Sequence, residues 1–166
     1  DVVDISNLQR QIAHVTDNIG LSKVASAAQA IQKINDNVSV TQLNSRLEGK
    51  ALADAIGAAD VVLDCTDNFS TRFAINAEAI QQKVPLVSGA AIRLEGQISV
   101  FDSRNEDSPC YQCLYQEGDD LQLSCSESGV MAPLVGIIGT LQAMECIKLI
   151  TGIGKILTGR LLFLDA

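Results

Sequence analysis

The chain has 166 residues, of which 47% are hydrophobic and 19% charged, and its formal net charge is −8. This length and composition are typical of one well-packed domain and exclude a disordered chain. The acidic balance argues against general binding to nucleic acid or anionic lipid, because both require a basic surface. A compact polyanion can still bind in a local pocket of basic side chains and backbone amides.

The cysteine count and the apolar stretches indicate where such a chain would work. Five cysteines with one close pair do not resemble the disulfide framework of a secreted protein, and the first residues show no signal peptide. The one membrane-like run, 130–149, carries Gln142, Glu145 and Lys148 at three-residue steps. This spacing predicts a helix buried on most of its circumference. We therefore expect a cytoplasmic protein without membrane attachment.

The first half of the chain alternates strand and helix signals. Residues 1–4 read as the end of a strand, and the apolar run that begins at residue 61 predicts a strand covered on both faces. Such alternation implies right-handed crossovers and a parallel sheet. The intervening elements are predicted as helices over 20–35 and 48–59 and a strand over 38–43.

The second half changes pattern after a helix predicted over 71–82. Strands over 85–87 and 97–101 are joined by too few residues for a helical crossover, so they should pair antiparallel. The polar stretch 103–129 predicts a long mobile or crossover loop, and a last strand over 160–164 completes the sheet. The prediction is one α/β domain, 1–166, with a Rossmann-like mixed sheet, parallel in its first half and antiparallel in its second, flanked by helices.

Two carboxylates, Asp64 and Asp67, end the apolar run. In open α/β sheets the ligand crevice lies at the carboxyl ends of the strands, so Asp67 is well placed to hold a hard cation or a polar ligand. The alternative is that Asp67 or Asn68 only caps the next helix. Ser70 is an equally good N-cap, which would leave Asp67 free. Spacing alone leaves both interpretations open.

Several motifs occur in one order along the chain. They are Ser-Asn-Leu-Gln-Arg-Gln at 6–11, Gly20-x-x-Lys23, Asp-Cys-Thr-Asp-Asn at 64–68 with Arg72 and Asn76, Cys110-x-x-Cys113, and Gly129-Val130-x-Ala132-Pro133. Together this series resembles the MoeB/ThiF family of sulfur-carrier adenylyltransferases, relatives of the ubiquitin-activating enzymes, over essentially the whole chain. A turn expected over 88–93 and the helix around 136–145 look closest to the molybdopterin-synthase branch, with the thiamine branch similar.

The resemblance implies ATP-dependent adenylation of the C-terminal glycine of a ubiquitin-like sulfur-carrier protein, in molybdopterin or thiamine biosynthesis. It implies that Arg10 binds phosphate and Lys23 adds positive charge, that Asn7 donates an amide hydrogen bond, and that Asp67 holds Mg²⁺. Asn68 joins the cofactor-binding set. The resemblance also implies a homodimer. Because the family's Gly-rich phosphate turn precedes these motifs, the chain is expected to lack the first βαβ segment and to be inactive as a fragment.

Each of these side chains has a structural alternative. Arg10 and Lys23 suit ordinary solvated surface positions, which is the commoner fate of such residues. Arg72 and Asn76 lie four residues apart on the predicted helix, where they would only brace that face or the adjoining loop. His14, the sole histidine, is assigned no catalytic role.

The cysteines offer one metal site and one reactive thiol. Cys110 and Cys113 have the spacing of half a four-thiolate zinc site, and the resemblance places the second pair downstream of residue 166. A redox pair or two plain thiols are the alternatives. Cys65 is expected in the buried strand and Cys146 on the long helix. Cys125 occupies a position where relatives carry a cysteine proposed to handle sulfur or a thioester.

Two other functions fit the predicted fold. An NAD-linked oxidoreductase shares the doubly wound sheet, although no G-x-G-x-x-G motif is present. A non-catalytic module that binds ubiquitin-like proteins is the second alternative. Three measurements would separate these functions. ATP–pyrophosphate exchange indicates the adenylyltransferase, hydride transfer to NAD indicates the oxidoreductase, and carrier binding without ATP indicates the binding module.

Overall fold

The computed structural model describes residues 1–116 and 129–166. Backbone proximity divides the chain into two compact units, Asp1–Arg46 and Leu47–Ala166. The single domain expected over residues 1–166 stays a prediction.

The N-terminal unit contains one α-helix, α1 (Lys23–Ile34), preceded by two 3-10 turns, η1 (Ile5–Asn7) and η2 (Thr16–Asn18). The helix predicted over 20–35 is thereby confirmed. It begins at Lys23 because Ser22 caps it, its Oγ accepting a hydrogen bond from a backbone N–H of the first turn.

Two strand predictions for the N-terminal unit are wrong. Residues 1–4 form one isolated bridge, between Val2 and Ser22, and no strand. Residues 38–43 form no strand either, and the side chains of Val38 and Leu43 are exposed. A β-branched sequence becomes a strand only beside a neighbour that completes its backbone hydrogen bonds. The described residues supply no such neighbour here.

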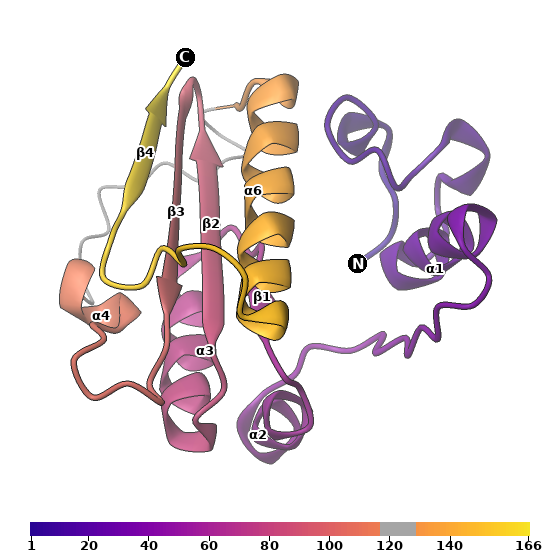
Figure 1. The fold of residues 1–166 in the computed structure, drawn as a ribbon. Helices are drawn as coiled ribbons and strands as arrows, with labels where there is room; N and C mark the ends of the chain where they lie inside the picture. The colour runs from indigo at the N-terminus through magenta and orange to yellow at the C-terminus, as the bar shows by residue number, and fades with distance from the viewer. Residues whose placement is uncertain (117–128) are drawn as a thin grey trace. The chain divides into compact units, whose positions relative to one another are not determined.

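The C-terminal unit is built on a mixed four-stranded sheet within the described residues, in the order β1-β2-β3-β4 (Figure 1). β1 pairs parallel with β2, and the other pairs are antiparallel. The change from parallel to antiparallel pairing therefore confirms the predicted mixed sheet. The strands are β1 (Val62–Asp64), β2 (Leu86–Ile92), β3 (Glu95–Phe101) and β4 (Leu162–Asp165).

The sheet departs from prediction at two places. The turn expected over 88–93 is wrong, because β2 continues to Ile92 and Arg93 takes up the reversal with a φ of +52°. β1 is not covered on both faces either, since Leu63 is 39% exposed. Leu63 pairs with Val87 and shares its face of the sheet, where α6 packs on β2 and β3 and leaves Leu63 open to solvent.

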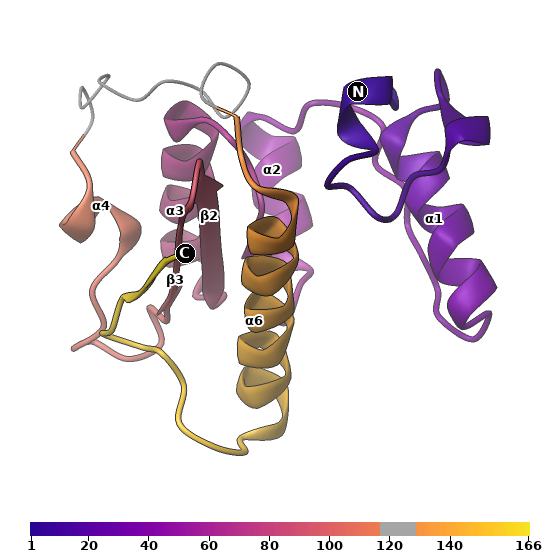
Figure 2. The same cartoon turned by 90° about the horizontal axis from the view of Figure 1, so that it is seen from above.

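Helices cover both faces of this sheet (Figures 1 and 2). Successive strand residues point to opposite faces, so Leu86 packs with α3 (Phe69–Gln82) and α2 (Gly49–Gly57). Val87 packs instead with the helix α6 (Ala132–Thr151). The helices predicted over 48–59 and 71–82 and after Val130 are confirmed.

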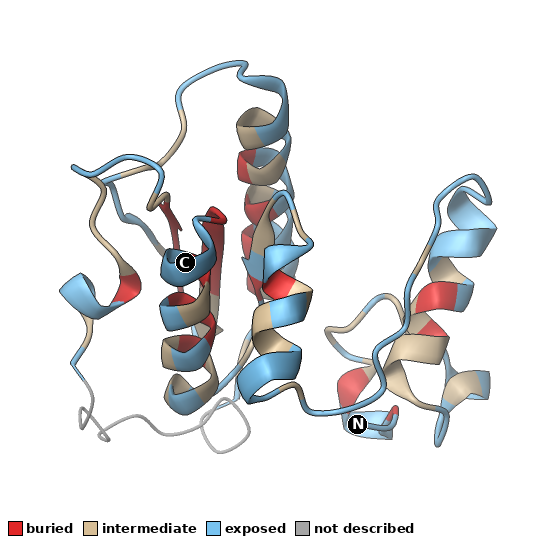
Figure 3. Cartoon of the chain, turned by 90° about the horizontal axis from the view of Figure 1, so that it is seen from below, coloured by how far each residue is buried: buried red, intermediate tan, exposed pale blue. Residues whose placement is uncertain are grey.

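α6 carries its polar residues on the buried side, contrary to expectation. Gln142 and Glu145 are 3% and 4% exposed, whereas Met144 and Ile147 are more than half exposed. The polar stripe faces inward because buried backbone groups there need hydrogen-bond partners. One of them is the backbone N–H of Leu157, which donates to Glu145. Figure 3 shows α6 carrying both buried and exposed segments. The prediction of a helix buried on most of its circumference is therefore wrong.

By length and composition alone, α6 could span a membrane. Its buried stripe packs against β2 and β3, as in a helix of a soluble core.

The segment expected to be a long loop, 103–129, is partly folded. Residues 103–116 include the short helix α4 (Tyr111–Leu114), held to α3 by the backbone N–H of Tyr111 donating to Asn76 Oδ1 at 2.9 Å. The remainder up to residue 128 lies outside the described residues, so its mobility stays a prediction.

We expect Gly96→Ala to destabilise the protein by about 1–3 kcal/mol, the usual cost of overpacking a filled core. A Cβ at position 96 would lie 2.7 Å from Ile138 Cδ1, where α6 packs on β3. Gly136→Ala is the control, because no described atom outside its chain neighbours and the local helix backbone lies within 4 Å of the new methyl group. Urea unfolding should show a loss for the first and a small gain for the second. An unchanged midpoint for Gly96→Ala would contradict this packing.

Candidate functional site

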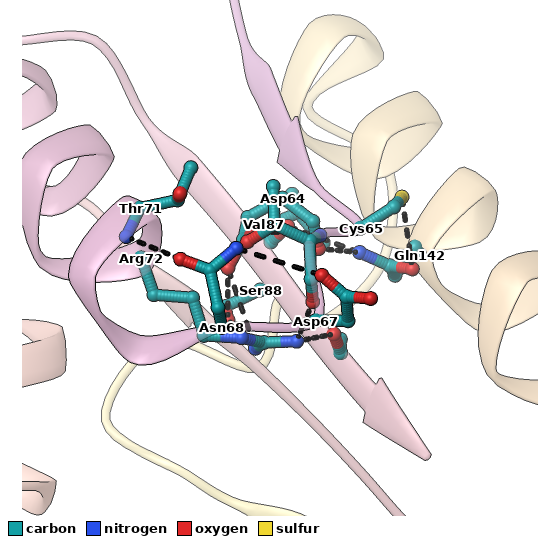
Figure 4. Close-up of polar contacts among 11 residues, drawn as sticks. Asp64, Cys65, Asp67, Asn68, Thr71, Arg72, Val87, Ser88 and Gln142 are labelled. Atoms are coloured by element: carbon teal, nitrogen blue, oxygen red, sulfur yellow. Dashed lines mark hydrogen bonds and ion pairs between the residues drawn. The ribbon is translucent and has the colours of Figure 1, made fainter. Parts of the chain in front are cut away.

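The turn that follows β1 is organised by a buried carboxylate, Asp64 (Figure 4). Asp64 is 1% exposed. Its Oδ1 accepts hydrogen bonds from the backbone N–H of Thr66 at 2.9 Å and from Thr66 Oγ1 at 2.7 Å, and its Oδ2 accepts one from Ser88 Oγ at 3.1 Å. Both carboxylate oxygens are thus committed to the turn and to β2.

Arg72, in the first turn of α3, neutralises this carboxylate. Its Nη1 lies 3.3 Å from Asp64 Oδ2, and the arginine is also buried, at 7% exposure. Nη2 donates to the backbone carbonyls of Thr66 and Gly89, the latter at 3.0 Å. The fixed fork of guanidinium donors suits several acceptors at once. Arg72 therefore braces the turn against α3 and β2. This agrees with the alternative interpretation of Arg72, in which it supports the loop beside its helix.

Gln142 reaches the same turn from α6. Its Nε2 donates to the backbone carbonyl of Asp64 at 2.8 Å and to that of Val87 at 3.2 Å. Its Oε1 accepts a hydrogen bond from Cys65 Sγ at 3.5 Å. Desolvation of the thiol and the charge of Asp64 raise the pKa of Cys65, so the thiol keeps the proton that it donates. Three elements, α3, β2 and α6, therefore hold residues 64–66.

Asp67 stands at the exposed tip of this turn. Asn68, also exposed, is the N-cap of α3, with its Oδ1 accepting from Thr71 N and Ser70 Oγ at 2.9 Å each. The suggestion of Ser70 as cap is wrong, because the helix begins at Phe69. Asp67 is nevertheless free of the cap, and among the described residues it forms no ion pair. Its Oδ1 accepts a hydrogen bond from Asn68 Nδ2 at 3.5 Å.

Asn7 and Arg10 lie on consecutive turns of the N-terminal unit. Asn7 is 8% exposed, and its Oδ1 accepts a hydrogen bond from the backbone N–H of Asp4 at 3.0 Å. Arg10 is partly exposed and donates from Nη1 to the carbonyl of Ser6 at 3.2 Å, with no ion pair among the described residues. Arg10 thus keeps most of its donors for another partner.

Lys23 lies in the first turn of α1, with 28% of its side chain exposed, and its Nζ pairs with Asp1 Oδ2 at 3.1 Å. Asp1 is 81% exposed in this pair, so the pair contributes little stability and can yield to another anion. The predicted roles of Asn7, Arg10 and Lys23 are compatible with these surroundings and remain predictions.

The predicted half zinc site brings two thiols together at the start of α4. Cys110 Sγ and Cys113 Sγ lie 3.6 Å apart, and the backbone N–H of Cys110 points at the second sulfur at 3.4 Å. Partial burial opposes the thiolate, but hydrogen bonds from the Cys113 side chain and from backbone groups outweigh it and lower the pKa of Cys110. Two sulfurs on one tetrahedral zinc lie about 3.8 Å apart when each Zn–S bond is about 2.3 Å. The pair therefore fits two corners of such a site.

The other described cysteines, Cys65 and Cys146, join no metal-ligand cluster. Within 1–116 and 129–166, no group of three or more His, Cys, Asp or Glu residues gathers as a metal site. The prediction of Cys65 in a buried strand is wrong, because Cys65 follows β1 and is partly open to solvent. Cys146 lies on α6 as predicted, and Cys125 is outside the described residues.

Sequence reasoning missed part of this site. The sequence pattern marks Asp64 only as the end of an apolar run, and it indicates no role for Ser88 or Gln142 in the site. A carboxylate in such a run is itself a signal, since a buried charge requires a partner. Gln142 gave no comparable signal, because its partners lie 55 to 78 residues away in sequence.

Comparison with protein families matches the ThiF family over residues 1–166. The chain belongs to the ThiF family. The molybdopterin-synthase adenylyltransferase of Salmonella typhimurium is 48% identical to this ThiF-family chain over 166 residues, 100% of the chain and 66% of the relative. The sulfur carrier protein ThiS adenylyltransferase of Escherichia coli is 43% identical over 153 residues, 92% of the chain and 61% of the relative.

The similarity covers only part of each relative. The ThiF-family chain spans just under two thirds of the length of these curated relatives. The crystal structure of E. coli MccB with ATP superimposes on it with a TM-score of 0.82, over 100% of the chain and 52% of that protein, at 17% identity. At that identity the superposition shows a shared α/β fold.

We expect Arg72→Met to destabilise the protein by about 3–5 kcal/mol, because it leaves the Asp64 carboxylate buried without its counter-charge. Lys50→Met is the matched control, since it removes a basic residue from the exposed Lys50–Asp54 pair, where little stability is at stake. Urea unfolding of the two variants checks the difference. Equal, small losses would show that the buried pair is not a stabilising contact.

Proposed function

We propose that the complete protein is an adenylyltransferase, which uses ATP to activate the C-terminal glycine of a ubiquitin-like sulfur-carrier protein. The observation that carries the proposal is the exposed carboxylate of Asp67 on a turn fixed by buried hydrogen bonds, within a ThiF-family chain. The curated relatives bear the names of adenylyltransferases, including one for the sulfur carrier ThiS.

Molybdenum-cofactor biosynthesis is the pathway that we favour. Identity to the molybdopterin-synthase enzyme of Salmonella typhimurium is 48% over all 166 residues, against 43% over 153 residues for the ThiS enzyme. Nothing in the comparisons supports an NAD-linked oxidoreductase or a non-catalytic binding module.

In the proposed reaction, the carrier's glycine carboxylate attacks the α-phosphate of ATP and pyrophosphate leaves. The enzyme performs little covalent chemistry, because its task is to hold two anions together and keep the attack in line. Arg10 offers paired guanidinium donors to phosphate oxygens, Lys23 offers an ammonium, and Asn7 offers an amide N–H. Adenylation needs no thiol, so Cys125 has no step in it.

Asp67 is the residue that we propose for magnesium. Mg²⁺ is commonly held by one or two carboxylates together with substrate phosphates and water, and an exposed carboxylate outside any described ion pair suits that donor set. When bound, the ion neutralises charge on the phosphates. The surrounding residues contribute by keeping the Asp67 turn in place.

Three further expectations remain proposals. Cys110 and Cys113 would bind structural zinc in the complete protein. The protein would be a cytoplasmic homodimer, to which the exposed apolar residues of α6, such as Met144 and Ile147, could contribute contact area. Its partners would be the carrier and a second copy of itself, and not nucleic acid, given the net charge of −8.

In the full-length protein, Asp67→Asn should lower carrier-dependent ATP–pyrophosphate exchange by at least about 10²-fold, because the amide keeps the shape and loses the charge. Asp60→Asn, an exposed carboxylate at the other end of β1, should exchange at the parental rate. Near-parental exchange by Asp67→Asn would rule out the magnesium role, whereas a parental protein without carrier-dependent exchange would overturn the proposed function.

For the zinc site, elemental analysis of the full-length protein should find about one zinc per chain. Cys110→Ser should remove it, while Cys146→Ser, a thiol on α6, should retain it. Zinc retained by Cys110→Ser at full stoichiometry would show that this pair is not a ligand.

A further inference from the structure

Gln142 is a buried amide whose described hydrogen bonds all end at the strand termini behind the Asp67 turn. It is 3% exposed, on the face of α6 that packs on the sheet. Its partners are the Asp64 carbonyl and the Cys65 thiol on one strand end and the Val87 carbonyl on β2. Figure 4 shows the amide reaching the turn from the α6 side, whereas Arg72 reaches it from α3.

β2 makes room for this amide with a glycine. A Cβ at position 89 would lie 2.8 Å from Gln142 Nε2 and 2.5 Å from Oε1, closer than real Cβ atoms approach other heavy atoms. The carbonyl of the same Gly89 accepts a hydrogen bond from Arg72 Nη2. Gly89 therefore lies between the two side chains that grip the turn, in contact with both.

The alternative for Gln142 is a plain stabilising role. A buried amide serving only that purpose could be satisfied by any local acceptors, such as the carbonyls of its own helix. Gln142 instead bonds groups two and three residues before Asp67, and the Asp64 carbonyl belongs to the residue whose carboxylate orders Thr66. Moving this amide moves the base of the turn that presents Asp67.

We propose that Gln142 is a positioning residue, which acts through the Asp64 carbonyl and Cys65 to hold Asp67 where the metal–nucleotide is bound. The inference rests on the proposed function of Asp67. The role requires both of its amide donors, so a side chain of similar size without them fills the space but leaves the turn unanchored.

Gln142→Met in the full-length protein tests the role with two measurements. Hydrogen–deuterium exchange of residues 64–68 should accelerate on the order of 10-fold, since a buried hydrogen-bonded anchor is lost. The Mg²⁺ concentration that gives half-maximal carrier-dependent ATP–pyrophosphate exchange should rise by a similar factor. A loss of folded enzyme alone would lower the maximal rate and leave this midpoint in place.

Leu134→Ala is the matched control, because it removes a buried α6 side chain that packs on β3 and makes no hydrogen bond to the turn. It should destabilise the protein without shifting the Mg²⁺ midpoint or selectively exposing residues 64–68. Gly89→Ala, which displaces the amide sterically, should reproduce the Gln142→Met behaviour and serves alone if that variant fails to fold.

The outcomes separate this inference from the function on which it rests. The positioning role alone would be overturned if Gln142→Met or Gly89→Ala changed neither hydrogen–deuterium exchange at residues 64–68 nor the Mg²⁺ midpoint. In that case Asp67→Asn would still be impaired in ATP–pyrophosphate exchange. The same changes in Leu134→Ala would also overturn it, as an effect of general destabilisation. An unimpaired Asp67→Asn would remove the Asp67 role on which the inference rests. A parental protein without carrier-dependent ATP–pyrophosphate exchange would overturn the proposed function itself.

Discussion

The site in the C-terminal unit depends on one buried ion pair, between Asp64 and Arg72. A carboxylate at 1% exposure is costly unless a base and hydrogen-bond donors surround it, and here Arg72, Thr66 and Ser88 meet that requirement. Because Arg72 also donates to the carbonyls of Thr66 and Gly89, the pair joins β1, β2 and α3 at one point. The exposed Asp67 is thus carried by a turn whose base is committed to the protein interior.

The polar residues on the buried side of α6 follow from the same requirement, that buried polar groups have hydrogen-bond partners. Strand ends and returning loops leave carbonyl and N–H groups that must be paired when they are buried. Gln142 and Glu145 pair with such groups, which draws the polar stripe of α6 inward and leaves Met144 and Ile147 exposed. The helix therefore serves two purposes: it covers one face of the sheet and satisfies the backbone behind the candidate site.

Sequence patterns predicted the parts of this fold that depend on local signals. Local signals predicted the four long helices of the described residues, and the short connection before residue 97 required an antiparallel pair. The strand at 38–43 failed because β propensity does not supply a pairing partner. Gln142 was beyond reach for a related reason, since its role exists only when α6 lies on the sheet. The functions of Asp67, Arg10 and Lys23 rest on chemistry and family membership, and remain proposals.

We propose that a turn anchored by buried hydrogen bonds presents Asp67 to a magnesium–nucleotide. A crystal structure of the full-length protein with ATP and magnesium is the decisive measurement. We expect an Asp67 carboxylate oxygen about 2.0–2.1 Å from the ion, with the Asp64–Arg72 pair and the Gln142 hydrogen bonds intact. A magnesium ion held by other residues, with Asp67 turned to solvent, would show that Asp67 does not hold the metal.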